Sequence, residues 1–191
     1  MKESLGYRKH ARVIRQGIVP EKYTRVAQYV IGHYVLEVGS AEGVLALTLA
    51  NEGREVVAVE QRLDRHATAM ELKEAWRKRG KRVDSCTLIN ENILERLDLL
   101  QNMDTLVAVR SIYYLRENVR PFFVEVAKHV RHVVLCGNPG RWPRCRDQED
   151  RLGEFNYYAS SEGMRELLDA SGYQITQEIK TGDPIVVGKR H

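Results

Sequence analysis

The sequence predicts an α/β fold: a three-layer, doubly wound sheet, mostly parallel, with seven strands and a C-terminal antiparallel hairpin. Short valine-rich runs, typical of strands buried on both faces, alternate with segments that have the period of amphipathic helices. Two last apolar runs flank Thr181-Gly182-Asp183, a turn typical of a hairpin. Because the 191 residues show no repeat or linker, a single domain over 1–191 is expected.

The strands are expected where short apolar runs are bounded by polar or glycine-containing turns. In chain order they are 35–38, 55–59, 83–89, 105–109, 132–136, 173–179 and 184–189. The first five alternate with helices, which favours parallel neighbours, because a parallel connection needs a crossover.

The helices are expected where apolar residues recur on one face. The first runs from Pro20 to Val30, because proline favours the first turn of a helix and Gly32 follows the last residue. The helix after Glu117 has the clearest period, with apolar residues at i, i+3, i+4, i+7, i+8 and i+11. The other helices are expected at 43–51, 64–76, 93–99 and 161–170.

Composition limits the classes of protein that this chain can belong to. The formal net charge of +4 is mild for a dedicated nucleic-acid binder, although basic residues cluster in the N-terminal arm, 1–19, and again at 77–82. No apolar run is long enough to span a bilayer, and no metal-ligand spacing is present. Three cysteines without a pairing pattern fit a reducing cytoplasm, so a cytoplasmic location is expected.

The segment Val35–Gly43, VLEVGSAEG, is the strongest local motif. A strand runs into a turn of small residues and then directly into a helix, which together form a nucleotide cradle. A dinucleotide fold needs small residues at the first, third and sixth positions from Gly39, and Val44 stands at the sixth. Small residues stand instead at the first, third and fifth, and Glu37 favours a cationic ligand over a phosphate.

In this respect the chain resembles class I S-adenosylmethionine-dependent methyltransferases over nearly its whole length. Their first motif, an acid followed by G-x-G-x-G, corresponds to Glu37, Gly39, Ala41 and Gly43, with alanine in place of the middle glycine and Ser40 within the turn. The resemblance implies S-adenosyl-L-methionine as cofactor. It also implies that Glu60, after the second strand, holds the ribose hydroxyls, because a carboxylate accepts two hydrogen bonds from a diol.

Further cofactor contacts are implied by position in the family. Gln61 would flank the ribose, and Glu91 and Asn92, after the third strand, would lie near the adenine amino group. Arg110 and Ser111, after the fourth strand, would lie beside the methionine part.

The acceptor is less well defined by the sequence. Tyr113 and Tyr114 are weak catalytic candidates that could line a substrate pocket, and 137–159 is a substrate loop rich in arginine and aromatic residues. We expect methyl transfer to a small-molecule or glycan-like acceptor, by in-line attack on the sulfonium methyl. An RNA methyltransferase that uses the basic arm and a non-catalytic protein that binds S-adenosylmethionine or S-adenosylhomocysteine are the alternatives. The sequence leaves the acceptor atom and the oligomeric state open.

Overall fold

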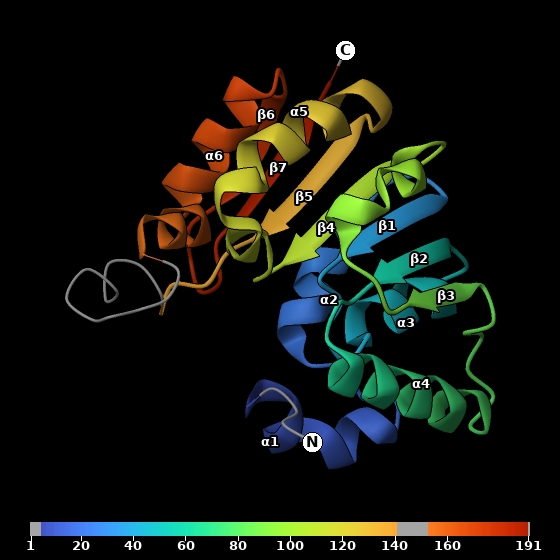
Figure 1. Ribbon diagram of the computed structural model, residues 1–191. Coiled ribbons are helices and arrows are strands. Elements are labelled where there is room, and N and C mark those ends of the chain that lie inside the picture. Colours follow the sequence, from blue (N-terminus) through green and yellow to red (C-terminus); the bar gives the residue numbers. More distant parts are fainter. Residues whose placement is uncertain (1–4, 141–152, 191) are drawn as a thin grey trace.

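The computed structural model describes residues 5–140 and 153–190. Within them, seven strands form one sheet in the order β3-β2-β1-β4-β5-β7-β6 (Figure 1). The strands are β1 (Tyr34–Val38), β2 (Glu55–Val59), β3 (Cys86–Ile89), β4 (Thr105–Val109), β5 (His132–Cys136), β6 (Gln174–Ile179) and β7 (Ile185–Lys189). Strands β1 to β5 run parallel to one another, and β7 runs antiparallel to both β5 and β6. The predicted sheet with its C-terminal hairpin is therefore confirmed.

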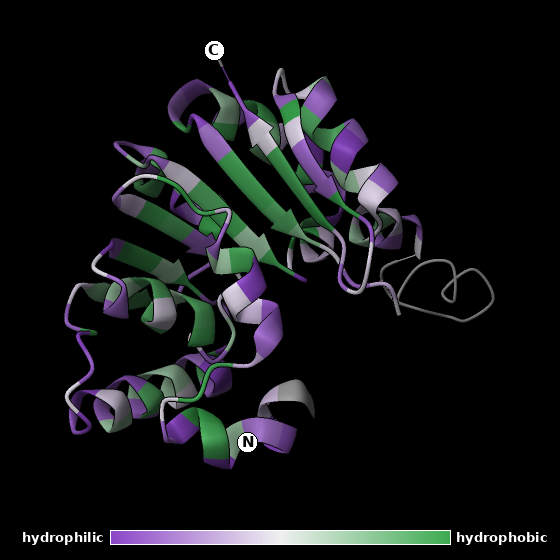
Figure 2. Cartoon of the chain, turned by 180° about the vertical axis from the view of Figure 1, so that it is seen from behind, coloured by the Kyte–Doolittle hydropathy of each residue, from purple (hydrophilic) through white to green (hydrophobic). Residues whose placement is uncertain are grey.

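Helices cover both faces of the sheet (Figure 1). The α-helices are α1 (Leu5–Arg15), α2 (Glu21–Ala27), α3 (Val44–Asn51), α4 (Leu63–Arg77), α5 (Val119–His129) and α6 (Ser161–Ala170). Short 3-10 helices are η1 (Ile93–Glu95), η2 (Leu97–Leu100), η3 (Ile112–Asn118) and η5 (Gly153–Ala159). Figure 2 shows the strands of the sheet as largely hydrophobic and the outer faces of the helices as mixed.

The alternation of side chains along each strand divides the core into two layers. In β1, Leu36 and Val38 pack with α5 and α6, whereas Val35 packs with α1 to α4. Glu37 has the same parity as Val35, so it belongs to the face covered by α2 and α3.

The order of the strands places a crevice between β1 and β4. The chain winds outward from β1 through β2 to β3 and then returns to the other side of β1 to form β4. Ligands of doubly wound sheets bind where the winding reverses in this way, beyond the carboxyl ends of the strands.

Three predicted boundaries were wrong. The third strand begins at Cys86 and not at Val83, because the amide of Cys86 donates to the carbonyl of Val83 and closes a turn there. The single helix expected at 93–99 is replaced by η1 and η2, with Arg96 in a non-helical conformation between them. The first expected helix, Pro20–Val30, is the shorter α2.

The segment 1–19 contains a packed helix, α1, where the sequence suggested an arm. Tyr7 and Ile14 are buried, and the indole nitrogen of Trp76 in α4 donates a hydrogen bond to the carbonyl of Ile14 at 2.6 Å. Of the expected substrate loop, 141–152 lies outside the described residues, and 153–159 form η5 with buried Asn156 and Tyr158. In the described part of the chain, no helix is long and apolar enough to cross a membrane.

Candidate functional site

A cavity of about 730 Å³ opens at the carboxyl ends of β1, β2 and β4. Every residue that the sequence proposed for the site lines this cavity, except Gly43. These residues are Glu37, Gly39, Ser40, Ala41, Glu60, Gln61, Glu91, Asn92, Arg110, Ser111, Tyr113 and Tyr114. Residues spread over nearly eighty positions of the chain therefore meet in one place.

The turn between β1 and α3 has a backbone that favours glycine. Gly39, Ala41 and Gly43 have φ values of 70°, 51° and 70°, and the amides of Gly39 and Ser40 both donate to the carbonyl of Val59. A side chain at Gly39 would lie 2.5 Å from Cβ of Ser111, so the turn can pack under η3 only without one.

Gly43 is absent from the cavity wall for a structural reason. It is the N-cap of α3, and a Cβ built there would lie 3.1 Å from Cβ of Ala69 in α4. Its small size therefore serves the close packing of α3 on α4.

Glu60 joins the glycine turn to the start of α4. Its Oε2 accepts a hydrogen bond from the amide of Ala41 at 2.8 Å, and its Oε1 accepts one from the amide of Arg62 at 2.9 Å. A carboxylate offers about four acceptor positions, so each oxygen keeps one for a ligand in the cavity. The carboxylate is thus held rigidly and can still accept two hydroxyl groups.

Glu37 is a buried acid at the base of the cavity. Its side chain is 2% exposed, and its Oε2 has no hydrogen-bond partner among the described residues. Burial, followed by the nearby charge of Glu60, raises its pKa to about 8, although a hydrogen bond from the backbone of Ala46 opposes this. An acid in this position is stabilised in its charged form only when a cation meets it.

Two residues of α2 face the same region. Burial, with the neighbouring charge of Arg110, lowers the pKa of Lys22, and burial next to Glu37 raises the pKa of Tyr23. The ammonium of Lys22 lies 4.5 Å from the centre of the Tyr23 ring. The base of the cavity therefore holds a cation and an acid that are both partly withdrawn from water.

The rim near β3 is more exposed. Glu91 forms an ion pair with Arg96 at 2.7 Å, and Oδ1 of Asn92 accepts from the amide of Leu94, which caps η1. The side chain of Asn90 donates to the carbonyl of Glu60 at 2.7 Å, which ties this loop to β2. Asn92 thus shapes the rim, and Glu91 keeps free acceptor positions beside its partner.

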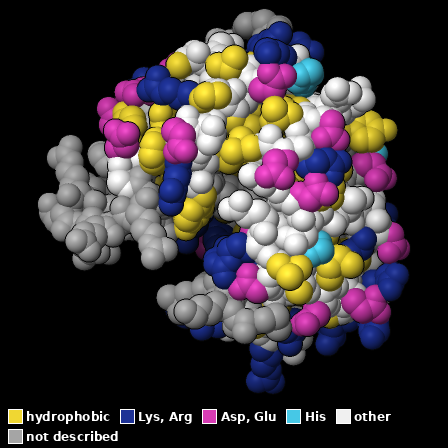
Figure 3. Space-filling model, viewed as in Figure 1, with side chains coloured by type: hydrophobic (Ala, Val, Ile, Leu, Met, Phe, Trp, Pro, Cys, Tyr) yellow, Lys and Arg dark blue, Asp and Glu magenta, His cyan; other side chains and the backbone are white. Residues whose placement is uncertain are grey.

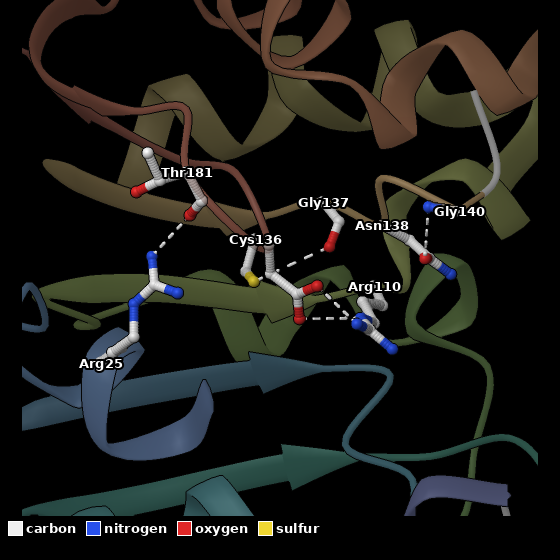
Figure 4. A network of polar contacts seen from close by, with 8 residues as sticks. Arg25, Arg110, Cys136, Gly137, Asn138, Gly140 and Thr181 are labelled. Atoms are coloured by element: carbon white, nitrogen blue, oxygen red, sulfur yellow. Dashed lines mark hydrogen bonds and ion pairs between the residues drawn. The ribbon is translucent and has the colours of Figure 1, made fainter. Parts of the chain in front are cut away.

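Arg110 ties the β6–β7 turn to the cavity wall (Figure 4). Its guanidinium donates two hydrogen bonds to Asp183, from Nε to Oδ2 at 3.0 Å and from a terminal nitrogen to Oδ1 at 2.5 Å. Arg25 of α2 reaches the same turn through the carbonyl of Thr181 at 2.9 Å. The neighbouring Ser111 donates from Oγ to the carbonyl of Val38 at 2.6 Å. The side chain of Arg110 therefore has a structural partner, and Arg110 also lines the cavity.

The two candidate tyrosines have different environments. Tyr113 is 2% exposed and belongs to the core, whereas Tyr114 is 48% exposed, and their ring centres are 4.7 Å apart. One ring is core and the other lies at the surface, although both reach the cavity.

A second cavity of about 460 Å³ adjoins the first and shares Arg116 and Glu117 with it. Its other walls come from Phe155, Tyr157 and Tyr158 of η5 and from the start of α5. Arg116 has φ 53° and ψ −128°, a conformation that is costly for any residue except glycine. The backbone is therefore strained where the two cavities meet.

Sequence reasoning missed several residues of the first cavity. Lys22 and Tyr23 stand in an ordinary helix before the motif, so no local pattern marks them. Glu42, which is 1% exposed, lies inside the glycine turn, and its position within that predicted turn was the signal that could have found it. Arg116 is recognisable only from its backbone conformation.

Comparison with known proteins identifies the fold. No family model and no curated protein matches the sequence. Among solved structures, magnesium protoporphyrin IX methyltransferase (ChlM) from Synechocystis PCC 6803 with bound SAH aligns with a TM-score of 0.65 and 17% identity, over 100% of this chain and 90% of that chain. The N-terminal domain of EvdMO1 with SAH bound aligns with a TM-score of 0.63 and 14% identity, over 91% and 83%.

A third structure, described for the conversion of a disulfide bond into a thioacetal group during echinomycin biosynthesis, aligns with a TM-score of 0.66 and 16% identity, over 91% of this chain and 82% of that one. The chain therefore has the Rossmann-like fold of S-adenosylmethionine-dependent methyltransferases. Its cavity lies where the winding of the sheet reverses, and it is lined by the acid Glu37, the small-residue turn and the second acid, Glu60, in the order that the motif requires.

Proposed function

We propose that this protein binds S-adenosyl-L-methionine and transfers its methyl group to a small-molecule or glycan-like acceptor. The observation that carries the proposal is the pair of carboxylates, Glu37 and Glu60, that line one cavity against the glycine turn. Fold likeness to ChlM and EvdMO1, whose structures contain SAM or SAH, supports the same cofactor class.

The polar groups of the cavity fit this cofactor. The buried oxygen of Glu37 that has no hydrogen-bond partner in the described part of the chain suits the ammonium of the methionine part, because an ion pair there stabilises the charged carboxylate. The free acceptor positions of Glu60 suit the two ribose hydroxyls. Glu91 at the rim can accept from the adenine amine. The carboxylate of Glu37 beside the turn disfavours a pyrophosphate, which argues against a dinucleotide.

The cofactor assignment is tested by calorimetry with S-adenosylhomocysteine and with NAD. Glu60→Gln should weaken binding of S-adenosylhomocysteine by about 10- to 100-fold, because the amide keeps one acceptor and loses the charge, a loss of about 1–3 kcal/mol. Glu55→Gln is the matched control, since Glu55 is exposed and begins the same strand at the opposite end of the sheet. Equal affinities of the two variants, or tight binding of NAD by the wild type, would contradict the assignment.

The proposed acceptor site is the second cavity. It adjoins the first at Arg116 and has three aromatic rings in its wall, and a volume of about 460 Å³ suits a small molecule. When bound, the cofactor supplies a methyl group on a positively charged sulfur. The chain then has to hold the acceptor in line with that methyl and exclude water, which is catalysis by positioning. Tyr113 and Tyr114 line the first cavity, and no general base is assigned.

The acceptor class is tested with radiolabelled S-adenosylmethionine and a fractionated lysate. We expect label to enter the small-molecule fraction in a manner resistant to ribonuclease. Label that enters only the RNA fraction, or cofactor binding with no transfer to any fraction, would reject the small-molecule acceptor. Phe155→Ala, in the wall of the second cavity, should lower transfer while leaving the affinity for S-adenosylhomocysteine unchanged.

A further inference from the structure

Two basic segments that are distant in the sequence lie side by side on the surface. The first is α1, which carries Arg8, Lys9, Arg12 and Arg15 and no acidic residue. The second is the C-terminal end of α4 with the turn that follows, where residues 77–82 contain five Lys or Arg. In Figure 3, Lys and Arg side chains project along the lower edge of the molecule, where Figure 1 places α1 and α4.

Buried contacts hold α1 against α4. Ile14 and Trp76 are each 1% exposed, and the indole nitrogen of Trp76 donates to the carbonyl of Ile14. Arg15 forms an ion pair with Glu71 at 3.5 Å. The stem of Lys81 packs against Gly17, and its ammonium lies 6.0 Å from the centre of the Trp76 ring. The two segments therefore form one surface, and the contacts that hold α1 leave Arg8, Lys9 and Arg12 exposed.

This basic face, defined as Leu5–Arg15 with residues 71–84, accounts for the net positive charge of the protein. It contains 10 of the 30 Lys and Arg residues and three of the 26 Asp and Glu residues, so its formal charge is +7 and that of the remaining chain is −3. Two of its three acids, Glu71 and Glu74, form ion pairs, the first with Arg15 and the second with Arg77 and Lys78. Six further cations at its surface have no ion pair with any described residue. These are Arg8, Lys9, Arg12, Arg79, Lys81 and Arg82.

We infer that the basic face binds the phosphate backbone of single-stranded RNA. Uncompensated like charges on one rigid surface repel one another, and a polyanion relieves this repulsion with release of its counterions. Most of the unpaired cations are arginines, whose planar guanidinium binds a phosphate through two hydrogen bonds.

Other partners of a basic surface fit less well. A helix that inserts into a membrane exposes its apolar side, whereas Tyr7 and Ile14 of α1 are buried. A protein interface needs an apolar or aromatic centre, and none of the exposed large hydrophobic side chains in the described residues lies in the basic face. A flexible single strand can adjust the spacing of its phosphates to these cations, whereas a duplex presents its phosphates at a fixed spacing.

The inference is tested by fluorescence anisotropy with a labelled 20-nucleotide single-stranded RNA at several salt concentrations. The wild type should bind, with an affinity that falls steeply as salt rises. The triple variant Arg8→Gln, Lys9→Gln, Arg12→Gln should bind at least 10-fold more weakly at 0.1 M salt. The slope of log affinity against log salt should fall by about two, at about 0.7 for each phosphate that the variant no longer neutralises.

The matched control removes three exposed cations elsewhere: Lys128→Gln, Arg131→Gln and Arg165→Gln. It should change the affinity less than 3-fold. A second variant, Arg79→Gln with Arg82→Gln, lies on the α4 side and should weaken binding as the α1 variant does. Thermal unfolding and binding of S-adenosylhomocysteine verify that each variant is folded.

Three results would overturn the inference: no RNA binding by the wild type at 50 mM salt, equal effects of the α1 variant and its control, or tighter binding to anionic vesicles, polyglutamate or duplex DNA than to the RNA. The inference goes beyond the proposed methyl transfer. Glu60→Gln should leave RNA binding unchanged, so failure of cofactor binding and failure of RNA binding are observed separately.

Discussion

Glu37 provides the sharpest test of the site, because its burial costs stability in a way that depends on pH. In the folded protein its pKa is about 8, against an ordinary value of 4.5. Between these values the folded protein holds a proton that the unfolded chain has released. The contribution of Glu37 to stability is therefore fully present below pH 4.5, decreases as the pH rises through 8, and is constant above that.

The magnitude follows from the same two values. The gap between 4.5 and about 8 corresponds to at most about 5 kcal/mol, at about 1.4 kcal/mol for each pH unit. Glu37→Gln keeps the shape of the side chain and removes its ionisation. At pH 8 the variant should have a higher free energy of unfolding than the wild type, and at pH 5 the two should be similar.

The assay is urea unfolding of both proteins at pH 5, 6, 7 and 8, followed by circular dichroism. Glu55→Gln, at the exposed end of β2, is the control and should reproduce the wild-type pH dependence. The variant should also bind S-adenosylhomocysteine more weakly, since the ammonium loses its carboxylate partner. If the wild-type and Glu37→Gln curves run parallel from pH 5 to 8, the reasoning about this buried acid is refuted.

Two further predictions concern the packing that builds the site and the basic face. Gly39→Ala should lower the free energy of unfolding, measured in urea, by about 2 kcal/mol or more, because a positive φ and the contact with Ser111 both oppose a side chain. Gly53→Ala is the control: Gly53 also has a positive φ but faces open space, so the loss should be smaller. Equal losses would argue against the contact with Ser111. Trp76→Phe should lower the free energy of unfolding by about 1–2 kcal/mol, because the hydrogen bond to Ile14 is lost. The same variant should speed hydrogen exchange of the amides in α1. Unchanged exchange there would show that α1 is held by other contacts.

Much of the fold could be predicted because its signals are local. The valine-rich runs at 55–59 and 132–136 became β2 and β5 with the predicted bounds, and the period after Glu117 became α5. The errors lie where local pattern and tertiary pairing differ. Val83 is apolar and buried, yet it is not in a strand, because its carbonyl closes a turn with the amide of Cys86.

The convergence of the candidate residues on one cavity was predictable for a related reason. In a parallel sheet the carboxyl ends of the strands meet at one edge, so residues that follow successive strands converge. Glu37 and Glu60 could be placed in this way from their distance to strand ends. Lys22 could not, because it precedes the sheet and reaches the cavity only through the packing of α2.

The sequence by itself determined the fold class, the small-residue turn and the two acids that flank it, because periodicity and the conformational freedom of glycine act within a few residues. Only the tertiary structure decided that Arg110 is paired with Asp183, that Oε2 of Glu37 lacks a partner among the described residues and that α1 lies against α4. Each of these depends on residues far apart in the chain, whose burial and charge are set by packing and not by their neighbours in sequence.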